Sequence, residues 1–471
     1  VADVEPLQPV LAVPLFWLAE LAPGIGLSHT VWLFNLLITA LTAGVLFAYG
    51  MALDYRPRAA AIVALLYGIG TIAWPYSRTF FREPLFTLLA LLSALLTLRL
   101  RHALTAGERP VGLAIALVVA FAGALFSKEA TFLLLPALVT QAIPDRLASG
   151  LAARRAVITL LVVAALIAAL LVIAVSAEAL FGVETVRWAA GNRLEQVRSN
   201  LTQAGEGVLG YLFSPGRSLW VYSPVLLAGF FGWPWLARRR RLRELAVPLV
   251  MLASFVVGYA LVRGEEWYGG TGWGPRYLVA VTPFLALWLL PVVERLLAPD
   301  ASRAGRVALV GLAIVSVGVQ VVAVLVPVDS YYALLARQDP PIIPWQEGAW
   351  SVRWSPLWVS INLLGAQRPD LLAARATGQA WVLPALAVLL MALALGTLVW
   401  WLRRRSGTPQ AVFLTVAGLA LGTVLALGGG LVAARHDPHY RGDFEPLRAL
   451  LAGLEPQLRP DDVVVLSDNA Y

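Results

Sequence analysis

The sequence predicts an all-α polytopic membrane protein with about twelve transmembrane helices. Hydrophobic residues make up 59% of the chain and charged residues only 14%, and the mean hydropathy is +0.75. A soluble protein of this composition would expose too much apolar surface to water. Long apolar runs alternate with arginine-containing loops, and about twenty apolar residues are needed to cross a bilayer as a helix.

Twelve apolar runs are predicted as membrane spans. They cover residues 28–50, 57–74, 83–100, 111–127, 130–143, 156–178, 219–236, 246–263, 276–296, 307–327, 380–402 and 410–433. The two short runs at 111–127 and 130–143 are separated only by the turn around Lys128, which predicts a helical hairpin. A thirteenth span before Val1 would place residues 1–27 in the first outer loop, so the chain is expected to be a fragment.

The arginine clusters predict the orientation of these spans. If the runs alternate across the membrane, five clusters fall on one face, at 99–101, 154–155, 238–241, 303–306 and 403–405. Most carboxylates then fall on the opposite face. Because basic loops stay in the cytoplasm, we expect a multi-pass protein of the plasma (inner) membrane whose active site faces outside the cytoplasm.

Three regions are predicted along the chain. Residues 1–27 form a first outer loop, whose short apolar segment Val10 to Leu21 is expected to be an interfacial helix. Residues 28–434 form the transmembrane module. Residues 435–471 are polar, with a helical pattern followed by a strand-like run, and predict the beginning of a truncated extracytoplasmic α/β domain.

Composition also limits the chemistry. Cysteine is absent, which excludes disulfides and thiolate ligands. The basic excess lies in short loops, where it sets topology, so nucleic-acid binding is not predicted. Lys128 is the only lysine. No cofactor is certain, and a divalent metal ion remains an open possibility.

The first candidate group lies where the span 83–100 begins. Arg78 and Arg82 flank an aromatic turn, and Glu83 precedes Pro84 at the first turn of the predicted helix. Glu83 has two interpretations: an acid that stabilises the helix N-terminus, or an acid that orients a substrate or metal beside two arginines suited to phosphate.

Three further groups fall on the same predicted face. Lys128 and Glu129 occupy the hairpin turn, as a binding pair or a solvated corner. Arg217 precedes a span, as a membrane anchor or a phosphate contact. A glycine- and aromatic-rich segment provides either a substrate site or an aromatic belt at the membrane interface; its candidate residues are Glu265, Glu266, Trp267, Tyr268, Arg276 and Tyr277.

Four short motifs resemble bacterial integral-membrane glycosyltransferases of the GT-C superfamily, in particular the protein O-mannosyltransferase and aminoarabinose transferase group. The motifs are Arg82-Glu83-Pro84-Leu85, Phe126-Ser127-Lys128-Glu129-Ala130 with Pro136, Ser214-Pro215-Gly216-Arg217 with Tyr222-Ser223-Pro224, and Gly274-Pro275-Arg276-Tyr277-Leu278 with Pro283. The resemblance implies transfer of a sugar from a polyprenyl-phosphate carrier to a lipid, glycan or protein acceptor outside the cytoplasm, with inversion at the anomeric carbon.

The resemblance also implies roles for individual residues. The principal acid of the family lies in the first outer loop, where Asp3 and Glu5 are the candidates in this sequence. Glu83 matches an acid of the second outer loop, Lys128 a lysine near the carrier phosphate, and Arg276 a second phosphate contact.

Two other classes of function remain open. A transporter or flippase of lipid-linked sugars would share the spans and the carrier, but it predicts ionisable residues at mid-membrane and related halves. Here most charges fall at span ends. A non-catalytic envelope assembly protein would use long outer loops equally well.

Overall fold

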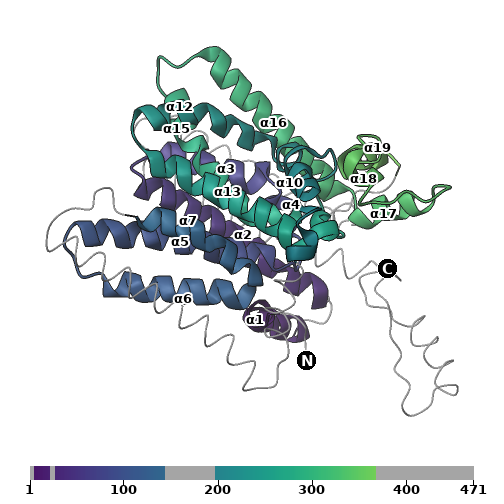
Figure 1. The fold of residues 1–471 in the computed structure, drawn as a ribbon, viewed down its shortest axis with the longest axis horizontal. Coiled ribbons are helices and arrows are strands. Elements are labelled where there is room, and N and C mark those ends of the chain that lie inside the picture. Colours follow the sequence, from purple (N-terminus) through teal and green to yellow (C-terminus); the bar gives the residue numbers. More distant parts are fainter. Residues whose placement is uncertain (1–4, 22–26, 144–196, 367–471) are drawn as a thin grey trace, which may run out of the picture. The chain divides into compact units, whose positions relative to one another are not determined.

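The structure is a computed structural model that describes residues 5–21, 27–143 and 197–366. The chain divides into two compact units, and the first, residues 1–16 and 31–370, contains every site discussed below. All regular elements within the described ranges are helices (Figure 1). They are α1 (Leu7–Leu21), α2 (Leu27–Ala52), α3 (Pro57–Gly70), α4 (Ala73–Ser77), α5 (Glu83–Thr105), α6 (Val111–Ser127), η1 (Glu129–Leu134), α7 (Leu135–Ala142), α10 (Ala204–Phe213), α11 (Leu219–Tyr222), η2 (Pro224–Gly232), α12 (Trp233–Arg238), α13 (Leu242–Arg263), η3 (Gly264–Tyr268), η4 (Arg276–Val281), α14 (Thr282–Leu287), α15 (Leu289–Leu296), α16 (Arg303–Leu325), α17 (Val328–Ala336), α18 (Glu347–Trp350) and α19 (Pro356–Leu363).

Five helical stretches in the described residues are long and apolar enough to cross a membrane. They are Thr30–Ala52, Glu83–Thr105, Leu242–Tyr268, Arg276–Leu296 and Arg303–Leu325. Each overlaps a span predicted from the sequence, and each begins or ends at a charged residue or within a few residues of one. The prediction of a helical protein with membrane-spanning segments is confirmed to this extent.

Four other predicted spans are shorter or interrupted. The run 57–74 is divided into α3 and α4 by extended backbone at Thr71, and the run 219–236 is divided into α11, η2 and α12. Pro224 and Pro234 lie in the first turns of two of these pieces, because proline fits a first helical turn but cannot donate within a helix. The hairpin 111–143 is present as α6, η1 and α7, which are short apolar helices.

Three predicted spans, 156–178, 380–402 and 410–433, lie outside the described residues. The predicted C-terminal domain 435–471 and Asp3 lie outside them as well.

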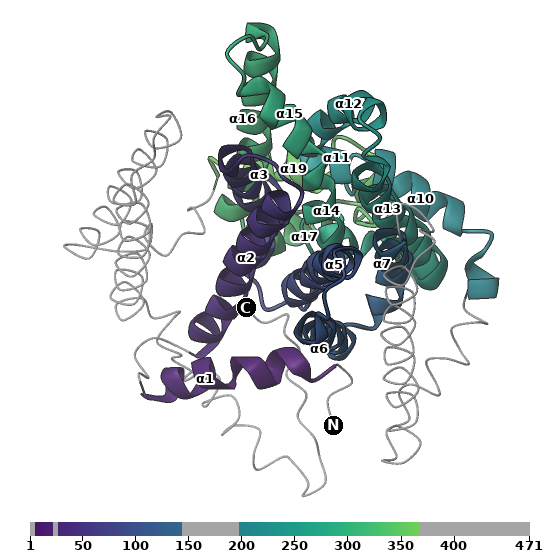
Figure 2. The same cartoon turned by 90° about the vertical axis from the view of Figure 1, so that its left-hand side faces the viewer.

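The predicted interfacial helix corresponds to α1. Figure 2 shows α1 running across the direction of α2. Within the first unit, Ala12 packs with Phe34, Ile38 and Leu85, while Val10 is 61% exposed. One face therefore packs on α2 and α5, and another is apolar and exposed.

The described helices have two chemically different ends. At one end, Arg56 pairs with Glu294 at 3.0 Å, and Arg241 donates to the Leu53 carbonyl at 3.1 Å. At the other end lie Glu83, which begins α5, and Arg276, which begins η4. Helices α5, α13 and η4–α15 thus run between an arginine-rich end and a Glu83-containing end, in the alternation that the sequence predicts.

The core positions these ends. Helix α14 is buried at every residue and contacts α3, α5, α13 and η2. Trp288 follows it and is fully buried against Phe230 and Trp233. Because α14 continues η4, its burial holds Arg276 in a fixed place against α5 and α13.

Candidate functional site

Three charged side chains from distant parts of the sequence meet at one point. The Lys128 ammonium donates to Glu83 Oε1 at 2.5 Å, and both side chains are 7% exposed. Arg276 Nε lies 3.6 Å from the same oxygen. We refer to Glu83, Lys128 and Arg276 as the Glu83 cluster.

Local backbone structure explains how each member of the Glu83 cluster is aimed. Glu83 begins α5, with Pro84 in the first turn. Lys128 has extended backbone (φ −161°, ψ 133°) between α6 and η1, which interrupts the helix at the charged residue. Arg276 begins η4 directly after Pro275. All three side chains therefore project from helix ends, where backbone direction changes.

The Glu83 cluster holds two cations against one carboxylate, an excess of one positive charge. Burial lowers the pKa of the Lys128 ammonium, and the Glu83 carboxylate acts in the opposite direction. Arg276 Nε is buried and has no hydrogen-bond partner in the described part of the chain. A buried cationic group with an unused donor is suited to an anion such as phosphate.

Aromatic rings line the Glu83 cluster. The Tyr277 ring centroid lies 5.5 Å from Lys128 Nζ, 5.2 Å from the Arg263 guanidinium and 5.3 Å from that of Arg276. Tyr259 stacks on Tyr277 with centroids 4.4 Å apart. Cation–π attraction in a desolvated setting stabilises such a group of cations, so Tyr277 orients three of them at once.

Two ion pairs flank the Glu83 cluster. Glu5 pairs with Arg82 and accepts the Glu129 backbone N–H at 2.7 Å. The Glu129 side chain lies 3.5 Å from Arg263. Glu5, from the first loop, is thereby brought beside the hairpin turn that carries Lys128.

Arg217 has a different environment from the one expected of a phosphate contact. It is 1% exposed, and its guanidinium donates to carbonyls of residues 269–274, the glycine loop. The acceptors are Gly272 O at 2.7 Å, Gly274 O at 3.0 Å, Gly270 O at 3.1 Å and the Tyr332 hydroxyl at 3.2 Å. This geometry favours an anchor for the glycine loop, which ends two residues before Arg276.

The remaining predicted residues lie apart from the Glu83 cluster. Glu265 accepts from Gln203 at 2.9 Å on the surface, and Glu266 is exposed. Trp267 is a core residue, 1% exposed and packed edge-on against Tyr211. Tyr268 stacks on Trp345, and Arg78 donates to the Val324 carbonyl at 2.5 Å.

Two polar residues that sequence reasoning missed position the turn before α5. The Asn35 amide donates to Thr79 O and Phe81 O, both at 2.7 Å, and Gln8 donates to Phe80 O at 2.8 Å. Both side chains are fully buried. Asn35 lies within a mainly apolar run. An amide inside a membrane span needs a hydrogen-bond partner, so its position in the sequence could have identified Asn35 as a structural residue.

The turns of the glycine loop give a sharp stability test. Gly274 has φ +61°, and an added Cβ would lie 2.6 Å from Tyr222 Cγ; Gly270 has φ +66° and open space around it. Both substitutions place a Cβ on a residue with positive φ, which costs free energy at either position. Only the Cβ of Gly274→Ala would also overlap Tyr222, so we expect Gly274→Ala to lower the free energy of unfolding by about 2 kcal/mol more than Gly270→Ala. Chemical unfolding in detergent measures both. Equal losses would contradict the packing of the loop on Tyr222.

In the ranges that the structure describes, no group of three or more His, Asp or Glu side chains is placed to hold a metal ion.

Comparisons of this chain with protein-family models, with curated proteins and with solved structures find no match.

Proposed function

We propose that this chain is an integral-membrane glycosyltransferase that uses a polyprenyl-phosphate sugar as donor, on the extracytoplasmic side of the plasma membrane. The observation that carries the proposal is the Glu83 cluster, where Lys128 and Arg276 share one carboxylate. Glu83 and Arg276 begin helical stretches that are long and apolar enough to cross a membrane, and Lys128 lies between two shorter apolar helices. A carrier with an apolar tail and an anionic head matches both features.

The cations of the Glu83 cluster are suited to the leaving group. When the bond between the anomeric carbon and the phosphate oxygen breaks, its electron pair stays on the phosphate, which gains negative charge. Lys128 and the Arg276 guanidinium can stabilise that charge electrostatically, because Glu83 and Tyr277 already fix the positions of both cations. Glu83 acts in this scheme as the acid that orients both cations.

The base is assigned to the first loop. An acceptor hydroxyl attacks the anomeric carbon and its proton passes to a carboxylate. Glu83 is engaged by two cations, whereas Glu5 keeps 24% of its side chain exposed while paired with Arg82. We therefore propose Glu5 or Asp3 as the proton acceptor, with a lipid, glycan or protein hydroxyl as the nucleophile. Exposed Glu265 and Glu266 are candidates for contacts to the acceptor.

A transfer assay tests the proposal. Proteoliposomes containing the chain would receive a polyprenyl-phosphate donor with a radiolabelled sugar, together with lipid, glycan and protein fractions of a bacterial envelope. We expect covalent label in one fraction, and loss of about 90% or more of it in Arg276→Gln, since a lost charged hydrogen bond is worth about 1.5–3 kcal/mol. Arg353→Gln, an exposed arginine stacked on Trp354, is the matched control.

Other outcomes of this assay would replace the proposal. Label that crosses the bilayer without covalent transfer would indicate a transporter of lipid-linked sugars. A chain that neither transfers nor moves the label, although it is folded, would indicate a non-catalytic envelope protein. Equal activity of Arg276→Gln and Arg353→Gln would remove the Glu83 cluster from the reaction.

A further inference from the structure

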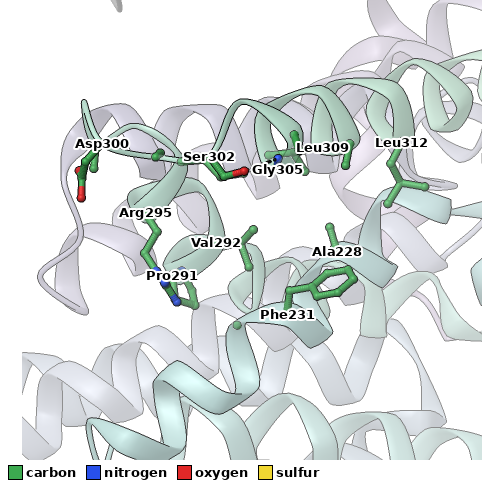
Figure 3. Close-up of a pocket in the computed structure, with 16 residues that line it drawn as sticks. Ala228, Phe231, Pro291, Val292, Arg295, Asp300, Ser302, Gly305, Leu309 and Leu312 are labelled. Atoms are coloured by element: carbon green, nitrogen blue, oxygen red, sulfur yellow. Dashed lines mark hydrogen bonds between the residues drawn. The ribbon is translucent and has the colours of Figure 1, made fainter.

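A second candidate site lies at the arginine-rich ends of the helices. A pocket of about 700 Å³ is enclosed by η2, α15 and α16. Figure 3 shows its walls, with Ala228 and Phe231 on one side and Leu309 and Leu312 on α16 opposite them. Its lining is mainly apolar, with a few polar groups at one end.

The apolar part of the pocket adjoins a surface suited to lipid. Phe231, which lines the pocket, is 79% exposed, and Val310 and Ile314 on α16 are 57% and 67% exposed. Helix α16 is long and apolar enough to cross a membrane. Because such a surface is stable only against hydrocarbon, the pocket is continuous with the space that lipid chains fill.

The polar end of the pocket carries two side chains of opposite charge. Arg295, in the last turn of α15, and Asp300, in the following loop, both line this end (Figure 3). Within the described residues, neither makes an ion pair, although the adjacent Glu294 pairs with Arg56. Arg306 is directed at the Leu296 and Ala298 carbonyls, so Arg295 is the lining cation with free donors.

We propose that this pocket binds a phospholipid with a primary ammonium headgroup, of the phosphatidylethanolamine type. An acyl chain fills the apolar part, Arg295 binds the phosphate, and Asp300 accepts hydrogen bonds from the ammonium. An anionic headgroup such as phosphatidylglycerol would satisfy Arg295 but would bring no cation to Asp300. A choline headgroup carries charge but no N–H donor, and it binds Asp300 less well.

The lipid site is separate from the Glu83 cluster. Arg276 and Arg295 lie near opposite ends of the stretch η4–α15, nineteen positions apart in the printed sequence, which corresponds to about 28 Å at helical rise. The site therefore does not depend on the proposed transferase activity. Its expected effect is structural: a bound lipid ties α15 to α16 across the loop between them.

The test uses the whole purified chain, delipidated in detergent and incubated with phosphatidylethanolamine, phosphatidylglycerol or phosphatidylcholine. Native mass spectrometry would count retained lipids, and thermal unfolding would report stabilisation. We expect preferential retention of phosphatidylethanolamine and a higher Tm with it. Arg295→Ala should lower its retention about fivefold, the effect of about 1 kcal/mol at an exposed ion pair. Asp300→Asn should lower the retention of phosphatidylethanolamine to that of phosphatidylcholine. It should leave the retention of phosphatidylcholine unchanged.

Two variants separate specific binding from general lipid association. Ala308→Phe adds bulk at a lining position and should reduce retention of all three lipids. Arg303→Ala changes an exposed arginine at the start of α16 that does not line the pocket, and it should leave retention unchanged. Equal retention of phosphatidylglycerol and phosphatidylethanolamine, or unchanged retention in both Arg295→Ala and Ala308→Phe, would overturn the proposal.

Discussion

Replacing Lys128 with methionine is expected to reduce sugar transfer about a hundredfold or more, the effect of removing one preorganised donor from a developing negative charge. Methionine keeps the length and apolar stem of lysine but cannot bind phosphate. The same change leaves the Glu83 carboxylate buried without its 2.5 Å partner. We therefore expect the free energy of unfolding to fall by about 3 kcal/mol as well.

A double variant separates the two effects. In Glu83→Gln/Lys128→Met the carboxylate and the ammonium are both removed, but Arg276 also loses its carboxylate partner. The free energy of unfolding should therefore recover only part of the loss expected for Lys128→Met. Transfer should remain low, because the donor to the phosphate is still missing. Initial rates of label transfer and chemical unfolding in detergent measure the two quantities on the same preparations.

A control for this pair exists at the other end of the helices. Glu294 is ion-paired with Arg56 but is more exposed than Glu83. Glu294→Gln should change the free energy of unfolding by no more than about 0.5 kcal/mol. It should leave the rate of sugar transfer unchanged. If the double variant regains both stability and transfer, the pairing of Lys128 with Glu83 is structural only, and the phosphate contact must be sought elsewhere.

Removing Arg217 should have the second large effect. Arg217→Ala removes four hydrogen bonds, to the Gly270, Gly272 and Gly274 carbonyls and to the Tyr332 hydroxyl, although Gly270 O keeps the Tyr332 hydroxyl and Gly274 O keeps the Arg276 backbone N–H as donors. It also opens a cavity where a buried side chain lay. We expect the free energy of unfolding to fall by about 3 kcal/mol or more, by the usual cost of unsatisfied buried groups. Donor binding should fall too, since the glycine loop holds the backbone that leads to Arg276.

A graded series makes this prediction specific. Tyr332→Phe removes one acceptor of Arg217 and one donor to Gly270 O, and it should cost only about 1 kcal/mol. Arg337→Ala, at an exposed position, should be neutral. Chemical unfolding in detergent and binding of the labelled donor would be compared across the three variants. A loss in Arg217→Ala no larger than that in Tyr332→Phe would contradict the anchoring role.

The positions of the long apolar helices along the chain were predictable from the sequence. The apolar runs at 83–100, 246–263 and 276–296 correspond to helices in nearly the predicted places, because about twenty apolar residues in succession have one stable solution in lipid. The breaks within apolar runs, where one predicted span becomes several short helices, were less predictable. The run 219–236 is as apolar as its neighbours, yet its prolines and Ser223 divide it into three pieces.

The role of a single charged residue was harder to infer. Arg217 and Arg276 both stand at the start of an apolar run, and both looked suited to phosphate. Their partners distinguish them. Loop carbonyls and a tyrosine hydroxyl take the donors of Arg217, while Arg276 Nε faces the Glu83 carboxylate at 3.6 Å and has no hydrogen-bond partner among the described residues. The sequence contains no signal for those partners, because they lie 53 or more positions away from Arg217.

The sequence by itself determined the class of this protein, a helical chain with segments long and apolar enough to span a membrane. Because apolar runs end where charged residues begin, the sequence also predicted that Glu83, Lys128 and Arg276 lie at the ends of apolar runs on one face. Which of these charges meet was decided only by the tertiary structure. Which helices pack side by side depends on the shapes of their side chains, such as the close fit of Gly229 to Trp288. That packing brings the ends of α5, α6 and η4 together.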